Sequence, residues 1–169
     1  MRVPMRVLAA LVSGFVVGAP AVAAQKAVLV TGASSGIGHA IAVRLAADGY
    51  FVYAGARKDA DLKALAAIPN VQPIRLDVTD AAQIAAAVAT VKQAGHGLYG
   101  LVNNAGIGSL APIIAPHKDE LDLTLAVNAV APYRMAQAFA PLILAQKGRI
   151  VTVGPPAASC PWASAVPTA

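Results

Sequence analysis

Short apolar runs alternate with amphipathic segments along most of this chain. Five runs have the length and composition of buried strands, at residues 27–30, 51–54, 71–76, 98–102 and 149–153. Between them, apolar residues recur at helical spacing, which predicts helices from 37 to a stop at Gly49, over 59–67, from a cap at Asp80 to a stop at Gly95, and over roughly 119–146. Strands that alternate with helices predict an α/β fold, in which a doubly wound parallel sheet of about five strands is buried on both faces.

The same spacing predicts which side chains of the helices face the sheet. Ile37, Ile41 and Leu45 recur on one side of the first helix, so we expect them to pack against the strands. The last helix contains Pro132 and Pro141, one of which is expected to bend it.

Residues 1–24 precede this pattern and have the order of a targeting segment. Arg2 and Arg6 come before an uncharged apolar run over 7–17, and small residues follow at 21–24. We expect a signal peptide here, with an N-terminal anchor or a start codon assigned too far upstream as alternatives. A real leader implies a periplasmic or secreted protein, and otherwise the protein is expected in the cytoplasm.

Residues 155–169 break the pattern at the other end. They contain four prolines among alanines and serines and carry no charge, so they continue neither a helix nor a central strand. An aberrant tail of this kind is typical of out-of-frame reading of GC-rich coding sequence, and a short natural tail is the alternative. The folded domain is therefore expected over 25–154.

Composition and charge exclude several classes of function. Hydrophobic residues make up 57% of the chain and charged residues 12%, which excludes intrinsic disorder. The net charge is +5, but the basic residues are scattered, so we expect no nucleic-acid partner. No metal site is expected either, because the only cysteine, Cys160, stands alone and the histidines are dispersed at positions 39, 96 and 117.

The turn after the first strand contains the first candidate chemistry. It reads TGASSGIG over 31–38, where Gly32 allows a tight turn, Gly36 a close approach by a ligand, and Gly38 close packing of helix on strand. A pyrophosphate can bind the backbone N–H groups of a helix that begins there. A glycine-rich turn without a ligand is the alternative. The predicted nucleotide contacts are Gly32, Ser34, Ser35, Gly36, Ile37 and Gly38.

Four further motifs follow in order: Leu76-Asp77-Val78, Asn103-Asn104-Ala105-Gly106, Leu125-Ala126-Val127-Asn128 and a strand over 148–153. Together with the glycine-rich turn, they resemble the classical short-chain dehydrogenase/reductase family over about 27–154. The resemblance implies the N-terminal part of a Rossmann-like domain and NAD(P)-dependent oxidoreduction of small lipophilic alcohols or carbonyl compounds. It also implies cofactor contacts at Asp77, Val78, Asn104, Ala105 and Gly106, and it makes Asn128 the one matching member of the catalytic set.

The end of the second strand bears on the choice of cofactor. Enzymes that select NAD carry an acidic residue there, whereas an arginine accommodates the 2′-phosphate of NADP. This chain has Ala56 at that position, followed by Arg57 and Lys58. We therefore predict NADP rather than NAD, with a solvated basic loop, partly neutralised by Asp59 and Asp61, as the alternative.

The resemblance fails at the residues that carry the family's reaction. Pro155 stands where the family has its catalytic serine, and no tyrosine is followed four positions later by lysine, because the residues at that spacing are Ala54, Arg57, Asn103 and Gln137. We expect a catalytically inactive, truncated or frameshifted form of the enzyme. A nucleotide-binding pseudoenzyme that acts through a partner and a non-functional translation product are the alternatives.

Overall fold

The computed structural model describes residues 25–108 and 118–154. The expected leader over 1–24 and the expected tail over 155–169, including Pro155, lie outside these residues. No helix in the described ranges is long and apolar enough to cross a membrane.

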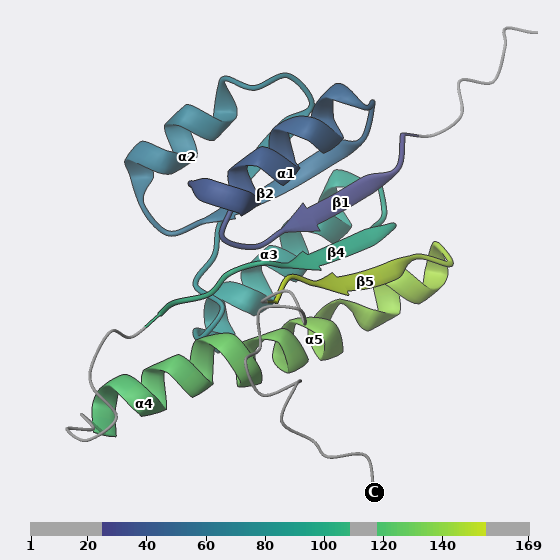
Figure 1. Cartoon of the computed structure of the whole chain (residues 1–169). Helices are drawn as coiled ribbons and strands as arrows, with labels where there is room; N and C mark the ends of the chain where they lie inside the picture. Colours follow the sequence, from purple (N-terminus) through teal and green to yellow (C-terminus); the bar gives the residue numbers. More distant parts are fainter. Residues whose placement is uncertain (1–24, 109–117, 155–169) are drawn as a thin grey trace, which may run out of the picture.

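The predicted α/β fold is confirmed. Its strands are β1 (Ala27–Val30), β2 (Phe51–Ala56), β3 (Val71–Arg75), β4 (Gly100–Asn103) and β5 (Arg149–Thr152). They form one parallel sheet in the order β3-β2-β1-β4-β5. The chain leaves β1 in one direction toward β2 and β3 and later returns on its other side to β4 and β5 (Figure 1). Ligands of such sheets bind beyond the carboxyl ends of the strands at this reversal, which places the region to search next to β1.

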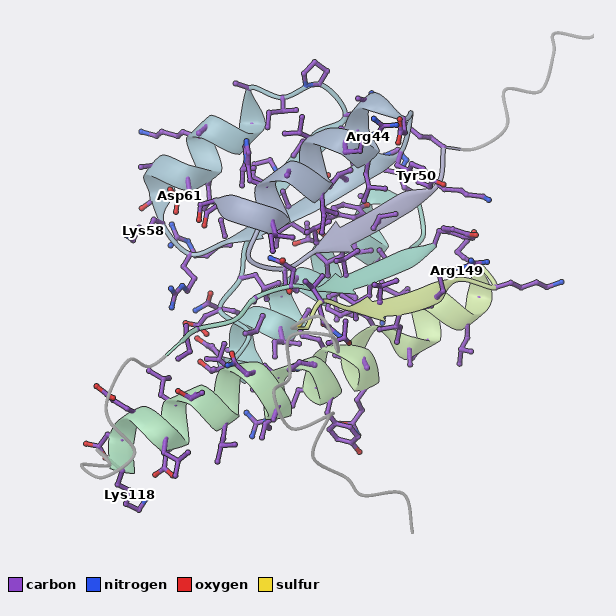
Figure 2. The ribbon with its side chains drawn as sticks, viewed as in Figure 1. Arg44, Tyr50, Lys58, Asp61, Lys118 and Arg149 are labelled. Carbon is purple, nitrogen blue, oxygen red and sulfur yellow. The ribbon has the colours of Figure 1, made fainter. Side chains whose placement is uncertain are left out.

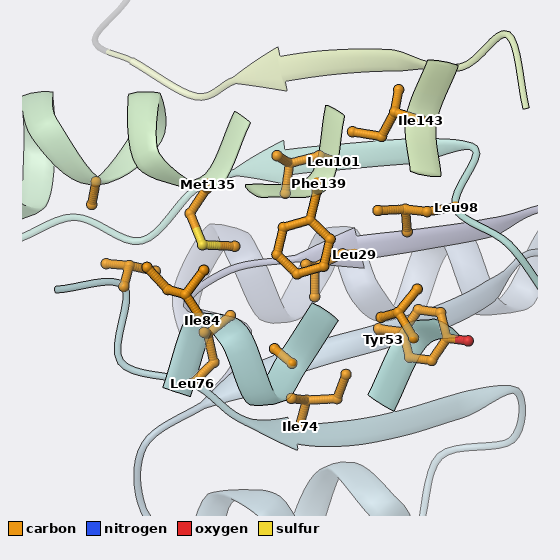
Figure 3. Packing of buried hydrophobic residues seen from close by; sticks show 14 of the residues in the cluster. Leu29, Tyr53, Ile74, Leu76, Ile84, Leu98, Leu101, Met135, Phe139 and Ile143 are labelled. Carbon is orange, nitrogen blue, oxygen red and sulfur yellow. The ribbon is translucent and has the colours of Figure 1, made fainter. Parts of the chain in front are cut away.

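The helices are α1 (Gly36–Ala47), α2 (Asp59–Ala66), α3 (Ala81–Ala94), α4 (Lys118–Leu125) and α5 (Ala131–Ala145). α1, α2, α3 and α5 cover the two faces of the sheet, whereas α4 extends beyond it and has no buried residue (Figure 1). Successive side chains of a strand point to opposite faces, and β1 is buried on both. Leu29 joins a core cluster with Met135 and Phe139 of α5, while Val30 joins a second cluster with Ala42 of α1. Figure 3 shows the first of these clusters, with Phe139 lying close to Leu29.

The buried face of α1 differs in part from the expected one. Ile37 is 64% exposed, so its predicted packing against the sheet is wrong, whereas Ile41 and Leu45 are partly buried and pack against the second core cluster. The residues that face the sheet are Gly38, Ala42 and Ala46. Small side chains let the helix backbone lie close to the strands, and the large apolar residues of α1 are thereby turned toward the edge of the interface.

The predicted ends of α3 are confirmed. The Asp80 carboxylate accepts hydrogen bonds from the backbone N–H groups of Ala82 (2.8 Å) and Gln83 (3.2 Å) and so caps the helix. Gly95 ends it with a φ of 75°, in the left-handed region that favours glycine. These contacts fix the segment that follows Asp77, which enters the site described below.

The last helical region is interrupted near Pro132. A π-helical segment, Ala126–Val130, separates α4 from α5. Pro132 has no N–H to donate to the carbonyl of Asn128, so an ordinary α-helical hydrogen bond cannot form at this point. Pro141 lies inside α5 without ending it. Of the two expected positions, the interruption is therefore at the first proline, and it falls on the motif that contains Asn128.

Tyr53 gives the first testable prediction, because its hydroxyl is buried without a hydrogen-bond partner among the described residues. Burial also raises the pKa of this phenol. Replacing Tyr53 with phenylalanine removes the unpaired group and keeps the ring, so we expect it to raise the free energy of unfolding by about 1 kcal/mol. Urea unfolding measures the change, and Tyr50→Phe, at a partly exposed phenol, is the matched control with no expected effect. A loss of stability in Tyr53→Phe would contradict the prediction.

Candidate functional site

The carboxyl ends of the strands next to β1 open into a cleft of about 380 Å³. It is lined by residues from the turns after β1, β2, β3 and β4, from the end of β2, from the first turn of α1 and from the π-helical segment: Gly32, Ser34, Ser35, Ile37, Gly55, Ala56, Arg57, Leu76, Asp77, Val78, Asn104, Ala105, Gly106, Ile107 and Val127. Ten of the twelve residues predicted to contact a nucleotide are in this lining, and Gly36 and Gly38 are not. The cleft lies where the sheet topology leads one to expect a ligand.

The turn from β1 into α1 forms one wall of the cleft and is held by neighbouring strands. The Thr31 N–H donates to the Val102 carbonyl (3.0 Å), and the Ala33 N–H donates to the Gly55 carbonyl (2.9 Å). Gly32 has a φ of 64°, and a Cβ atom at this position would lie 2.8 Å from the Cα of Ala105. Only glycine therefore allows the turns after β1 and β4 to approach each other this closely.

The amino end of α1 is available to an anion. Ser35 caps the helix through its extended backbone, but its side chain makes no capping hydrogen bond, and the first turn contains no acidic residue. Ser34 and Ser35 are both exposed at the cleft. The first backbone N–H groups of a helix lack partners within it, so they and the two hydroxyls are free to bind negative charge.

Gly38 lies behind the cleft, where α1 packs against the turns after β1 and β4. A Cβ atom here would overlap Asn104 Nδ2 and the Gly32 carbonyl oxygen. The backbone of α1 therefore lies directly against the turns after β1 and β4, as expected of a glycine that allows close packing. Gly36 has a φ of 57°, and a Cβ atom there would meet nothing within 4 Å, so it serves the turn and leaves open space beside it.

Thr31 and Asn104 tie the two turns together. The Thr31 hydroxyl accepts from the backbone N–H groups of Asn104 (2.9 Å) and Ala105 (3.0 Å) and donates to the Val102 carbonyl (3.3 Å). Asn104 Nδ2 donates to the carbonyls of Thr31 (3.0 Å) and Gly32 (3.2 Å). The side chain of Asn104 thus joins the turn after β4 to the turn after β1. Thr31 was not among the predicted site residues, although its position in the glycine-rich motif was the available signal.

Asp77 is fixed by its own turn at the β3 side of the cleft. Its carboxylate accepts hydrogen bonds from the Thr79 hydroxyl (2.6 Å) and the Thr79 N–H (2.9 Å). These bonds, the hydroxyl first, hold the pKa of Asp77 below its ordinary value, and the positive charge of Arg57 acts in the same direction. Asp77 is therefore an ionised acceptor at neutral pH, next to the buried Val78.

Arg57 stands at the mouth of the cleft. Strand β2 runs two residues further than predicted and includes Ala56, which is buried and paired with Arg75 of β3. The exposed Arg57 follows directly, so the chain leaves the sheet at this residue. Its position beside Ala56 brings a cation to the place where an acidic side chain would otherwise line the cleft.

Asn128 makes a two-point contact with the loop after β4. Its Oδ1 accepts from the Ile107 N–H (2.9 Å), and its Nδ2 donates to the Ile107 carbonyl (2.7 Å). Asn103 adds a weaker contact from its Nδ2 to the Pro132 carbonyl (3.4 Å). The polar atoms of Asn128 are therefore used to hold Ile107 at the cleft, and the π-helical segment presents the side chain for this contact.

The described lining of the cleft combines the open amino end of α1 with two ionisable side chains, Arg57 and Asp77. This set suits an anion with a hydrogen-bond donor at one end. Within the described residues, no three histidine, cysteine, aspartate or glutamate side chains gather as a metal-binding group. The residue aligned with the family's catalytic serine, Pro155, lies outside the described part of the chain.

Comparison with known proteins agrees with this geometry. A family model described as short chain dehydrogenase matches residues 26–167. The chain belongs to the short-chain dehydrogenase family. Among curated relatives, the short-chain dehydrogenase PC-15 of Penicillium crustosum is 40% identical over 131 residues, which are 76% of this chain and 48% of that protein. The human 17-beta-hydroxysteroid dehydrogenase type 1 is 40% identical over 146 residues, which cover 78% of this chain and 43% of the relative. The chain thus spans about half the length of the curated relatives it matches.

Solved short-chain dehydrogenases share the fold. A metagenomic short-chain oxidoreductase in complex with NADP is 36% identical, with a TM-score of 0.72 over 80% of this chain and 65% of that one. The alcohol dehydrogenase of Thermococcus sibiricus, complexed with 5-hydroxy-NADP, is 28% identical, with a TM-score of 0.72 over 76% of this chain and 57% of that one.

Proposed function

We propose that this chain is the nucleotide-binding part of an NADP-dependent carbonyl–alcohol oxidoreductase. The observation that carries the preference for NADP is Arg57, placed at the mouth of the cleft directly after the buried Ala56. An acidic residue at the end of β2 would bind the ribose 2′-hydroxyl of NAD and repel a 2′-phosphate. Here a guanidinium takes that place and can pair with the phosphate through charge-assisted hydrogen bonds.

The remaining walls of the cleft fit the other parts of such a dinucleotide. The amino end of α1, with Ser34 and Ser35, supports binding of the pyrophosphate. The Asp77 carboxylate supports binding of an exocyclic amino group such as that of adenine, because it is an ionised acceptor. Bound nicotinamide supplies the hydride that these oxidoreductases transfer. Two solved relatives carry NADP or an NADP derivative, and this supports the choice of cofactor.

We further propose that the 169 residues bind the cofactor without turning over a substrate. This follows from the residues that the sequence lacks, Ser at the end of the fifth strand and Tyr-x-x-x-Lys. The substrates of the whole protein are proposed to be small lipophilic alcohols or carbonyl compounds. A chain that binds nucleotide without turnover fits a binding module as well as an inactive form of the enzyme, and co-purification with a second protein would favour the module.

Calorimetric titration of the 169-residue chain with NADPH and NADH tests the cofactor assignment. We expect NADPH to bind more tightly than NADH. We expect Arg57→Ala to weaken NADPH binding by a factor of about 10 to 100, the size of one charge-assisted contact, and to leave NADH binding unchanged. Lys63→Ala, in the exposed middle of α2, removes the same charge away from the cleft and is the matched control. Equal affinity of the unmutated chain for both cofactors would overturn the assignment.

A further inference from the structure

Arg75 links the last residue pair of β2 and β3 to the loop that carries Arg57. It lies opposite Ala56 in the parallel ladder and is the last residue of β3. Its Nη1 donates to the main-chain carbonyl of Arg57 (2.7 Å), and its Nη2 forms an ion pair with Asp59. One guanidinium therefore holds both the backbone of Arg57 and the carboxylate of Asp59 at the start of α2.

The exposure of this ion pair argues against a role in stability. The Arg75 side chain is 49% exposed and the Asp59 side chain is 80% exposed. Exposed ion pairs of this kind contribute little to the free energy of unfolding, because water and salt screen them. Asp59 does not need Arg75 for the helix either, since acidic residues in the first turn of a helix are already favourable, as Asp59 is in α2.

The Arg75–Asp59 ion pair has a larger effect on the charge around Arg57 than on the stability of the fold. Asp59 is two residues from Arg57, and without Arg75 its carboxylate would be free to pair with Arg57 or to repel an arriving phosphate. Arg57 already interacts electrostatically with Asp77, whose pKa it lowers. The carboxylate of Asp59, once without its partner, would add a second negative charge beside Arg57 and so reduce the positive potential at the place where a 2′-phosphate would bind.

We propose that Arg75 is a positioning residue for cofactor selection, which fixes the Arg57 backbone and neutralises Asp59 so that the Arg57 side chain stays available to a 2′-phosphate. This inference rests on the proposed preference for NADP. Three contacts of Arg75 support it: its side chain donates to the Arg57 carbonyl and pairs with Asp59, and its backbone is paired with Ala56 in the ladder.

The test compares NADPH and NADH affinities of four forms of the full 169-residue chain by calorimetry: the unmutated chain, Arg75→Gln, Asp59→Asn and the double variant. We expect Arg75→Gln to weaken NADPH binding about tenfold, as one partly screened charge near a phosphate would, and to change NADH binding less than twofold. Asp59→Asn in the Arg75→Gln background removes the freed charge, so we expect it to restore NADPH affinity to within about threefold.

Arg44→Gln is the matched control, because it breaks a similarly exposed ion pair with Asp48 and changes the net charge equally. Arg44 lies on α1, well away from Lys58 before α2 and Asp61 in its first turn (Figure 2), and its loss is expected to leave both affinities unchanged. Thermal unfolding of every variant separates binding from folding. Should Arg75→Gln unfold, Arg75→Lys takes its place. Lysine keeps the charge but lacks the fork that contacts both the Arg57 carbonyl and Asp59, so we expect a loss of NADPH affinity of less than tenfold with NADH binding unchanged.

The outcomes distinguish this inference from the proposed function. A preference for NADPH that survives Arg75→Gln, or a loss that Asp59→Asn fails to restore, overturns the role of Arg75 alone. Equal loss of NADPH and NADH binding in Arg75→Gln also overturns it, since that pattern indicates a structural role. Equal affinities of the unmutated chain for the two cofactors overturn the cofactor assignment and this inference together.

Discussion

Alanine in place of Gly38 is expected to lower the free energy of unfolding by about 3 kcal/mol and to weaken NADPH binding by at least tenfold. The added Cβ would overlap Asn104 Nδ2 and the Gly32 carbonyl oxygen, and the oxygen belongs to backbone that cannot move alone. Relief requires α1 to shift away from the sheet or Asn104 to release its bonds to Thr31 and Gly32. Either change opens the turn that the pyrophosphate is proposed to bind. Urea unfolding followed by circular dichroism, with a calorimetric titration, measures both effects.

Gly36→Ala is the control for this prediction. A Cβ atom there meets nothing within 4 Å, so the only cost comes from its φ of 57°, about 1 kcal/mol. The two substitutions add the same atom two residues apart and differ in what that atom meets. Equal stability of the two variants would show that the contact behind α1 is not tightly packed.

Much of the fold was predictable because parallel strands covered by helices on both faces leave a strong sequence pattern. The run over 27–30 is β1 as predicted, since an apolar stretch stopped by a glycine-rich turn has few other interpretations. Asp80 and Gly95 were predictable for a local reason: a carboxylate before a helix and a glycine after it act on backbone groups only a few residues away.

The orientation of α1 was predictable only in part from the spacing of large apolar residues. Ile41 and Leu45 pack against the core as expected and Ile37 does not, while the fully buried positions are Gly38, Ala42 and Ala46 on the neighbouring stripe. A helix that packs closely on a sheet needs small side chains at the contact. A buried face predicted from the large apolar residues therefore falls on the adjacent stripe. Ile37 consequently lies at the cleft, where it was also predicted to contact the nucleotide.

The sequence predicted which loops line the candidate site, but it did not predict the contacts that hold those loops together. Motif order placed Gly32, Asp77, Asn104 and Gly106 at the cleft, although their roles toward a cofactor stay predictions. The partners that hold these loops lie far away in the sequence, as with the bonds from Asn104 to Thr31 over 73 residues. Such tertiary contacts leave no local pattern, so the hydroxyl of Thr31 was not assigned a role.

Asn128 connects the site to the question of catalysis. The resemblance to the family assigns it to the catalytic set, yet both polar groups of its side chain are bound to Ile107. These two hydrogen bonds use both the oxygen and the nitrogen of its amide without any lysine, and they hold the loop after β4 at the cleft. The contact with Ile107 therefore gives Asn128 a structural role that does not depend on proton transfer.

The second large effect is expected in catalysis, where the 169-residue chain should leave bound NADPH unoxidised. Reduction of a carbonyl requires a proton donor at the oxygen as the hydride arrives, and no tyrosine of this sequence has a lysine four positions later. Loss of a positioned acid alone lowers a rate by about 10² to 10⁴, and Pro155 also removes a hydroxyl that would bind the carbonyl oxygen. The measurement is the loss of nicotinamide absorbance with aldehydes, ketones, steroids and retinoids, beside a full-length short-chain dehydrogenase as positive control.

Gly36→Trp fills the open space at the amino end of α1 and controls for contaminating enzymes. Turnover by the purified chain that disappears in Gly36→Trp would show that these residues contain a proton donor that the sequence comparison does not identify.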